Sequence, residues 1–332
     1  MAILKVFLRF AESLLQDSTS ATALSLDKIA ISYEEYAYIG ARASLKAEVL
    51  ERASHIPNSE TMTPEESAKK WYGGKNWEKE SGVFPDFVFG FEGEGGVGDG
   101  ALLELKDSKD VSIASFNSTL PISRKALSVL SPMVRNAVNT WDTVQVAKEG
   151  YPDERDCYYL IRTSCKDASK VRISLVQGTF FETLPTKDLL KALWENLLPN
   201  DVTEEERKTV IDILARIDRE NISSTQHIPH ASIKPRLRLM SEIEAEGNPH
   251  TYPEIAPRTL NLITKLREEN PEAKRRELEE WANREGLGVR WQDDSICQIT
   301  HGDFTLEMSV SVLKHKRNGW HRVCQVRLPD LG

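Results

Sequence analysis

The sequence has no long uninterrupted apolar run and only four cysteines among its 332 residues. A membrane helix requires about 20 consecutive apolar residues, so we expect no membrane-spanning segment. The cysteines form no closely spaced pair, which argues against a zinc site and favours free thiols in a cytoplasmic protein. The first residues, MAILKVFLRFAESLLQ, are interrupted by Lys5, Arg9 and Glu12. We therefore predict an amphipathic helix there rather than a signal peptide.

The sequence also lacks a Gly-x-x-x-x-Gly-Lys-Ser/Thr loop, the motif that cradles the phosphates of a nucleoside triphosphate. This absence argues against an NTP-driven motor within the chain. Positive charge is not in excess, because 43 Lys and Arg residues stand against 51 Asp and Glu residues, a net charge of −8. Domains that bind nucleic acid are often basic. Any such contacts in this protein would have to come from local basic clusters.

A hairpin-like segment between residues 84 and 108 is the most informative part of the chain. It has the sequence FPDFVFGFEGEGGVGDGALLELKDS, in which strand-like runs flank a cluster of Gly and Glu. With the turn centred on Gly95, Asp86 would lie opposite Glu104, and alternation would place Lys106 on the same face as Glu104. The opposite face would collect Phe87, Phe89, Ala101, Leu103 and Leu105. A shift of one residue would turn one strand over.

A charge-paired hairpin face without catalytic role is the simpler interpretation of these residues. Other Glu-x-Lys triplets occur at residues 206–208 and 272–274. They lie in segments with helical patterning, where side chains two residues apart do not face each other. Only Asp86 with Glu104 and Lys106 combines strand patterning with hairpin spacing.

At Pro85-Asp86 and Glu104-x-Lys106 the sequence resembles the PD-(D/E)xK nuclease superfamily, in particular type II restriction endonucleases. The order of expected elements is similar over residues 30–200. A helix is predicted over 36–53, a second from Pro121 through Val146, and strands over 157–163 and 171–177. The resemblance implies an α/β fold, with a mixed sheet in a restriction-endonuclease-like core flanked by helices.

The resemblance also implies catalytic roles for Asp86, Glu104 and Lys106. Asp86, Glu104 and the carbonyl oxygen of Leu105 would bind Mg²⁺, a hard cation held by one or two carboxylates together with waters and phosphate oxygens. Lys106 would position the attacking water or stabilise negative charge. We favour stabilisation, because neighbouring carboxylates favour the charged form of an ammonium. Asp99 is an alternative first ligand, although its glycine-rich surroundings suggest a turn. Glu48, with Glu51 next, is a candidate additional acid, although an ordinary solvated helix glutamate is the favoured interpretation of either residue.

Polar and basic side chains indicate where a DNA duplex would bind. The segment after Lys106 is rich in Ser, Asn and Thr and ends in a cationic pair on the first turn of a predicted helix, groups that suit phosphates and base edges. Near the C-terminus, a turn at Asn318-Gly319 predicts a hairpin with a basic tip. The candidate DNA contacts are Ser108, Lys109, Asn117, Ser118, Arg124, Lys125, Lys314, Lys316 and Arg317. An ordinary polar loop and a charged sheet edge are the alternatives.

Four regions are expected along the chain. Residues 1–80 form the helical N-terminal part of the catalytic region, 81–220 the nuclease core, 221–256 a connector, and 257–332 a smaller helix-plus-β-hairpin domain for DNA recognition or dimerisation. A capping box at Thr203 and Glu206 opens a helix. Further helices are predicted over 258–269 and 271–285, and an alternating strand over 304–312.

These expectations describe a Mg²⁺-dependent, site-specific endonuclease that hydrolyses double-stranded DNA, a type II restriction enzyme of the prokaryotic cytoplasm. Cutting both strands is simplest for a homodimer with twofold symmetry. A matching DNA methyltransferase would be its genetic neighbour. The alternatives are a repair or recombination nuclease that selects DNA structures, and a non-catalytic nucleic-acid-binding protein.

Overall fold

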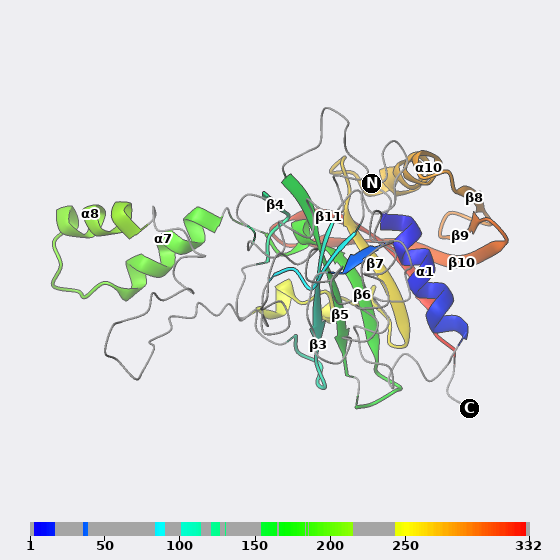
Figure 1. Ribbon diagram of the computed structural model, residues 1–332, viewed down its shortest axis with the longest axis horizontal. Coiled ribbons are helices and arrows are strands. Elements are labelled where there is room, and N and C mark those ends of the chain that lie inside the picture. The colour runs from blue at the N-terminus through cyan, green and yellow to red at the C-terminus, as the bar shows by residue number, and fades with distance from the viewer. Residues whose placement is uncertain are drawn as a thin grey trace, which may run out of the picture.

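The centre of the protein is a mixed β-sheet of eleven strands, seen in a computed structural model (Figure 1). The strand order is β1-β2-β3-β5-β6-β7-β11-β10-β9-β8, and β4 pairs with β5 outside this path. The structure describes residues 3–16, 36–38, 84–89, 101–113, 121–126, 130, 154–164, 166–182, 184, 186–214 and 243–329. The expected α/β class with a mixed sheet is confirmed.

The elements in the described part of the chain follow one another with these bounds. The strands are β1 Tyr36–Tyr38, β2 Phe87–Phe89, β3 Leu102–Asp107, β4 Arg124–Ala126, β5 Glu154–Thr163, β6 Arg172–Gln177, β7 Thr259–Lys265, β8 Gly288–Trp291, β9 Ile296–His301, β10 Phe304–His315 and β11 Gly319–Arg327. The α-helices are α1 Ile3–Gln16, α7 Thr186–Leu197, α8 Glu204–Leu214 and α10 Lys274–Arg284. Single 3₁₀ turns are η5 Gly178–Phe180, η6 Ala245–Gly247, η7 Pro249–Thr251 and η8 Pro271–Ala273.

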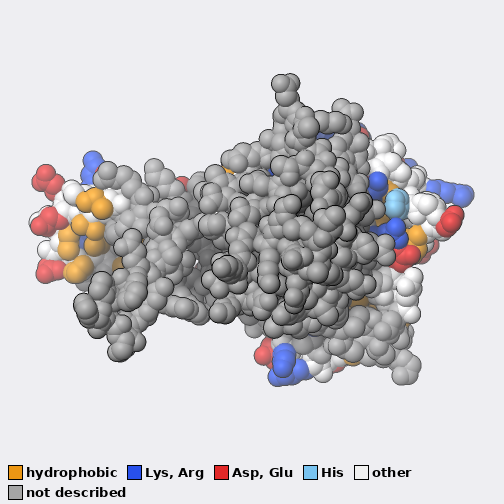
Figure 2. Space-filling model, in the orientation of Figure 1, with side chains coloured by type: hydrophobic (Ala, Val, Ile, Leu, Met, Phe, Trp, Pro, Cys, Tyr) orange, Lys and Arg blue, Asp and Glu red, His pale blue; other side chains and the backbone are white. Residues whose placement is uncertain are grey.

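Two of the strand pairs are parallel, β3 with β5 and β6 with β7. Parallel neighbours cannot be joined by a tight turn, so each pair needs a long crossover connection. The second crossover contains α7 and α8, which extend away from the sheet in Figure 1. Hydrophobic side chains lie at the surface of this helical pair (Figure 2), where Leu197 is 63% and Ile213 is 50% exposed.

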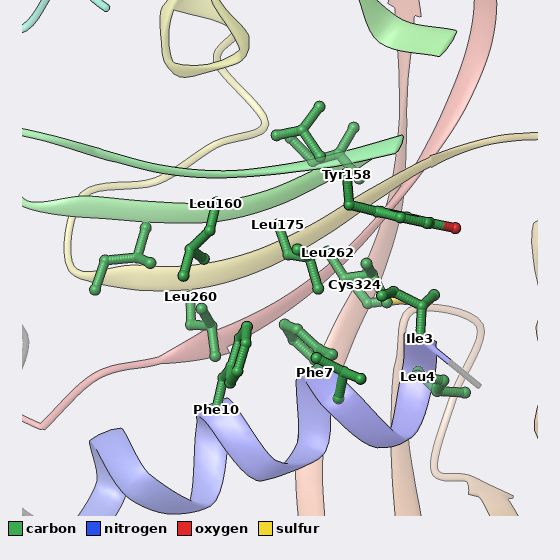
Figure 3. Close-up of a cluster of buried hydrophobic side chains, with 14 of the residues drawn as sticks. Ile3, Leu4, Phe7, Phe10, Tyr158, Leu160, Leu175, Leu260, Leu262 and Cys324 are labelled. Atoms are coloured by element: carbon green, nitrogen blue, oxygen red, sulfur yellow. The ribbon is translucent and has the colours of Figure 1, made fainter. Parts of the chain in front are cut away.

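Helix α1 covers one face of the sheet, as its predicted amphipathic pattern requires. Phe7 and Phe10 are fully buried, and Figure 3 shows both rings directed at the sheet. The sheet residues labelled in Figure 3 lie on β5, β6, β7 and β11; they are Tyr158, Leu160, Leu175, Leu260, Leu262 and Cys324. We call this side of the sheet the α1 face.

The N-terminal end of α1 is held by a buried carboxylate. The backbone amides of Leu4 and Lys5 donate to Glu285, at 3.3 and 2.9 Å. The first amides of a helix have no partner within the helix, so an acceptor there satisfies them. Burial raises the pKa of Glu285 from 4.5 to about 7, although the two amides oppose the shift. The stability of the fold should therefore depend on pH through this residue.

We expect the free energy of unfolding to fall by about 3 kcal/mol through Glu285 as the pH rises from about 4.5 to about 7. Glu285 ionises at a lower pH in the unfolded chain than in the folded protein. Raising the pH over this range therefore favours the unfolded chain, until the folded carboxyl is ionised as well. Urea denaturation of wild type and Glu285→Gln at about pH 5 and pH 8 measures the effect. The difference in free energy of unfolding between wild type and Glu285→Gln should change with pH. Parallel pH profiles would contradict the assignment.

Several predicted elements are confirmed. The strands expected over 157–163 and 171–177 are β5 and β6, and the strand expected over 304–312 is β10. The helix over 271–285 is η8 with α10, and Gly286 follows it with φ +68°. The capping box is present, because Thr203 N donates to Glu206 (3.0 Å) and Glu206 N to Thr203 Oγ1 (3.3 Å).

Three segments predicted to be helical contain strands instead. Tyr36–Tyr38 is β1, whose aromatic residues favour a strand, and residues 39–53 of that prediction lie outside the described part. Arg124–Ala126 is β4, since a proline at residue 121 fits an extended chain as well as a helix start, and residues 127–129 and 131–146 of that prediction lie outside the described part. Thr259–Lys265 is β7. Both faces of β7 are buried, so it lacks the alternation of apolar and polar residues that identifies a half-exposed strand.

The sheet continues through the region expected to be a separate C-terminal domain. Strands β7 to β11 belong to the same sheet as β1 to β6, and their buried side chains form one hydrophobic cluster with α1. The turn between β10 and β11 pairs His315 with Gly319, so three residues form the loop, and Gly319 has φ +73°. None of the helices in the described part of the chain is long and apolar enough to cross a membrane.

Candidate active site

The predicted hairpin has the expected register. Phe87 pairs with Leu103 and Val88 with Leu102, so the antiparallel pairing of β2 and β3 is symmetric about Gly95. Extending this register by one residue places Asp86 opposite Glu104. The expected burial is only partly right, because Leu102 and Glu104 are buried as well as Leu103 and Leu105. Both faces of β3 are covered, as is usual for a strand with a parallel neighbour.

Glu104 and Lys106 point to the same side of β3 and form an ion pair. Lys106 Nζ lies 2.9 Å from Glu104 Oε1. The side chains are 9% and 15% exposed, respectively. This side of the sheet, opposite the α1 face, also carries Tyr159 and Ile161, the β5 partners of the two residues. We call it the Glu104 face.

Asp86 is fixed against the backbone of β3. Its Oδ2 accepts a hydrogen bond from the amide of Leu105, at 2.9 Å. In an antiparallel ladder, the two residues of a hydrogen-bonded pair face each other, and the amide of each donates to the carbonyl oxygen of the other. The residue opposite Leu105 in this register is Pro85, which has no amide hydrogen to give. Pro85 therefore cannot donate a hydrogen bond to the Leu105 carbonyl.

The loop before β4 and the turn η5 pack over the Glu104 face. The Tyr159 hydroxyl accepts from the Ile122 amide (3.0 Å) and donates to its carbonyl (3.3 Å). The Ser123 amide donates to Glu182 at 2.7 Å. A Cβ on Gly178 would lie 2.0 Å from the Ile122 carbonyl oxygen, so only glycine fits there. These contacts hold two loops next to the strand that carries Glu104.

Two neighbouring groups have structural roles. Arg162, buried on the α1 face, donates to both oxygens of Asp107 at 3.0 and 2.6 Å, which secures the end of β3 after Lys106. This is the bidentate geometry of a strong ion pair. Cys157 lies on the Glu104 face, and burial raises the pKa of its thiol far above the usual range. Cys157 is therefore not a nucleophile at neutral pH.

The expected DNA-binding residues occupy mixed environments. Lys109 is exposed and Ser108 is half-buried just after β3. Arg124 lies on β4, not on a helix, and pairs with Asp156 at 3.2 Å. Lys125, on the same strand, lies 5.0 Å from the centre of the Phe84 ring. The remaining candidates in this region are outside the described residues; they are Asn117, Ser118, Asp99 and Glu48.

The basic tip of the β10–β11 hairpin is docked against the protein. Arg317 and Lys316 pair with Glu246 at 2.9 and 3.5 Å. Lys314 lies over the Trp320 ring, at 5.4 Å from its centre. Asn318 donates to the carbonyl of Glu182 at 3.0 Å. Part of the positive charge expected to contact DNA is thus compensated within the chain.

The donor set fits a hard divalent cation. Asp86, which is bonded to the Leu105 amide, and Glu104, which precedes Leu105 on β3, supply two carboxylates, and Mg²⁺ needs only one or two besides water and phosphate oxygens. Within the described ranges, no group of three or more His, Cys, Asp or Glu side chains is placed to hold a metal ion. A site of this kind would have to complete its coordination with water and substrate.

A buried histidine on the Glu104 face was not foreseen. His250 Nδ1 lies 2.7 Å from Thr163 Oγ1, and Nε2 lies 2.8 Å from Ser174 Oγ. Burial, and secondarily Arg172, lowers the pKa of His250 to about 3, so the ring is neutral at physiological pH. Polar residues within the otherwise apolar strands β5 and β6 were the available signal, because buried polar groups require partners.

No known protein family, curated protein or solved structure matches this chain.

Proposed function

We propose that the protein is a Mg²⁺-dependent endonuclease that hydrolyses phosphodiester bonds in double-stranded DNA, with its active site at Asp86, Glu104 and Lys106. The observation that carries the proposal is the hairpin register. It places an ammonium and one carboxylate 2.9 Å apart on β3, and the second carboxylate 2.9 Å from the amide between them. A phosphodiesterase of this class needs the same three charged groups.

Asp86, Glu104 and the Leu105 carbonyl would hold the metal. Mg²⁺ bound there would supply Lewis-acid stabilisation of charge on the phosphate. Lys106 would contribute a positive charge directed at the phosphate oxygens, where negative charge develops in the transition state. The hydrogen bond from the Leu105 amide fixes one oxygen of the Asp86 carboxylate next to β3. The Arg162–Asp107 pair keeps the end of β3 in place.

Access to the site is restricted, because the side chains of Glu104 and Lys106 are 9% and 15% exposed. A phosphodiester can reach them only if part of the chain that covers the Glu104 face moves. Such a closed site would exclude water other than the attacking molecule, which strengthens electrostatic interactions within it.

We further propose that the protein is a type II restriction enzyme that acts as a homodimer, since twofold symmetry places one active site on each DNA strand.

Plasmid cleavage tests the proposal. Supercoiled plasmid incubated with protein and Mg²⁺ should give discrete linear fragments, and excess EDTA should abolish them. Oligonucleotides with flaps, junctions or mismatches, tested in parallel, distinguish a restriction enzyme from a repair nuclease. The competing interpretation, a charge-paired face without catalysis, is favoured by the Glu104–Lys106 ion pair itself. It predicts no cleavage of any substrate, and cleavage that persists in EDTA would contradict the metal mechanism.

A further inference from the structure

A polar depression lies on the Glu104 face, several strands away from the candidate active site. It has a volume of about 470 Å³, within the range of small-ligand sites. Its floor is formed by β7, β9, β10 and β11, and its wall by residues 256–258. The polar and charged residues lining it are Arg258, Thr259, Glu307, Ser309, Gln325 and Arg327.

One residue in the floor of this depression, Gln325, belongs to a buried hydrogen-bond network. Gln325 Nε2 donates to the Glu254 carbonyl (3.1 Å) and to Asn261 Oδ1 (2.7 Å). Asn261 Nδ2 in turn donates to Ser174 Oγ (3.2 Å), which contacts His250. A network whose members are satisfied fixes its side chains. Since both amide hydrogens of Gln325 are used, its Oε1 is the atom that remains to accept a bond from a ligand.

Arg258 has an unusual backbone for its residue type. Its φ is +56°, in the left-handed region that favours glycine. Its amide donates to the Val171 carbonyl at 2.6 Å, and its carbonyl accepts from Leu328 at 2.8 Å. These bonds hold the strained conformation, which is a reason to look for a role of the side chain. The guanidinium donates to the Ala168 carbonyl at 3.3 Å, and the residue lines the depression.

Arg327 gives the depression a second cationic group. It is exposed at the end of β11, and it forms no ion pair with any residue that the structure describes. The depression thus offers guanidinium donors from Arg258 and Arg327, and acceptor oxygens from Gln325 and Glu307. Guanidinium groups bind phosphate by charge-assisted hydrogen bonds, while the acceptors require a ligand that also carries donors.

We propose that this depression binds a phosphate-bearing ligand with hydrogen-bond donors, as a nucleotide has, through Arg258, Arg327 and Gln325. The nucleotide is either free or part of a DNA strand. Lys106 and Gln325 lie in one row across the sheet, through Ile161, Ser174 and Asn261. Four strand spacings separate them, about 20 Å. One duplex could therefore span both sites, although binding at the depression does not depend on nuclease activity.

Binding measurements in EDTA separate this proposal from the nuclease assignment. Binding of adenosine monophosphate is measured by calorimetry, and binding of a labelled DNA duplex by fluorescence anisotropy. Each ligand is tested with four proteins: wild type, Arg327→Glu, Arg258→Gly and Arg290→Glu. Arg290 is the matched control, because it is exposed on the neighbouring strand β8 and does not line the depression. Glycine at position 258 keeps the left-handed backbone, so the loss of the guanidinium is tested in a folded protein.

We expect both depression variants to weaken binding by at least about tenfold and the control to change it little. If adenosine monophosphate binds and the two depression variants weaken its binding, the ligand is a free nucleotide. If the mononucleotide does not bind but the duplex shows the same pattern, the phosphate belongs to DNA. Failure of both ligands to bind, or an equal loss in all three variants, would overturn the proposal. Thermal melting of each variant establishes that it is folded.

Discussion

Lys106→Ala is expected to lower the rate of Mg²⁺-dependent DNA cleavage by about 100- to 1,000-fold, the usual effect of removing one group that stabilises transition-state charge. Lys106 is the only candidate catalytic cation on β3, and its ammonium lies 2.9 Å from Glu104. Its removal leaves both carboxylates in place. The measurement is the initial rate of plasmid linearisation at saturating Mg²⁺.

Metal binding distinguishes a catalytic role of Lys106 from a structural one. Calorimetric titration should show that Lys106→Ala still binds Mg²⁺, whereas Glu104→Gln binds it weakly, because a carboxylate ligand is lost. Lys170→Ala is the matched control, since Lys170 lies on an exposed turn and pairs with Asp167 at 3.1 Å. It should cleave like wild type. Unchanged cleavage by Lys106→Ala would remove this residue from the mechanism.

Phe7→Ala is expected to reduce the free energy of unfolding by about 3–5 kcal/mol, because it leaves a cavity between α1 and the sheet. Phe7 is fully buried against the strands that form the α1 face (Figure 3). Guanidinium denaturation followed by tryptophan fluorescence measures the change. We expect a lower midpoint with a similar slope, since the surface exposed on unfolding is nearly the same.

Arg9→Ala is the matched control for this prediction. Arg9 lies on the same helix, and its side chain is 44% exposed and pairs with Glu12 at 2.8 Å. An exposed ion pair contributes about 0–1 kcal/mol, so its loss should be small. If Phe7→Ala were as mild as Arg9→Ala, α1 would not belong to the cooperative core of the protein.

Local signals in the sequence were sufficient to predict the hairpin and the positions of its charged residues. The glycine-rich turn and the flanking strand-like runs defined the pairing of Phe87 with Leu103, and alternation then placed Glu104 beside Lys106. The turn before Gly319 was found for the same reason. These features depend on residues close together in the sequence, where turn chemistry and periodicity act directly.

Features set by distant parts of the chain could not be predicted in the same way. The identity of β7 as a strand depends on β6 and β11, which lie on either side of it and leave it buried on both faces. β4 has three residues and is defined by its pairing with β5. The His250 network joins β5, β6 and η7, and the tip of the β10–β11 hairpin meets Glu246. Such contacts leave no periodic trace in the sequence.

The position of β11 has a consequence for synthesis on the ribosome. β11 follows both β7 and β10 in the chain, yet it lies between them in the sheet. Until residues 319–327 have emerged, β7 and β10 expose unpaired backbone groups, and α1 has only part of its docking surface. The nascent chain therefore cannot complete its core before β11 has emerged. A chaperone that shields those open edges would raise the yield of native protein.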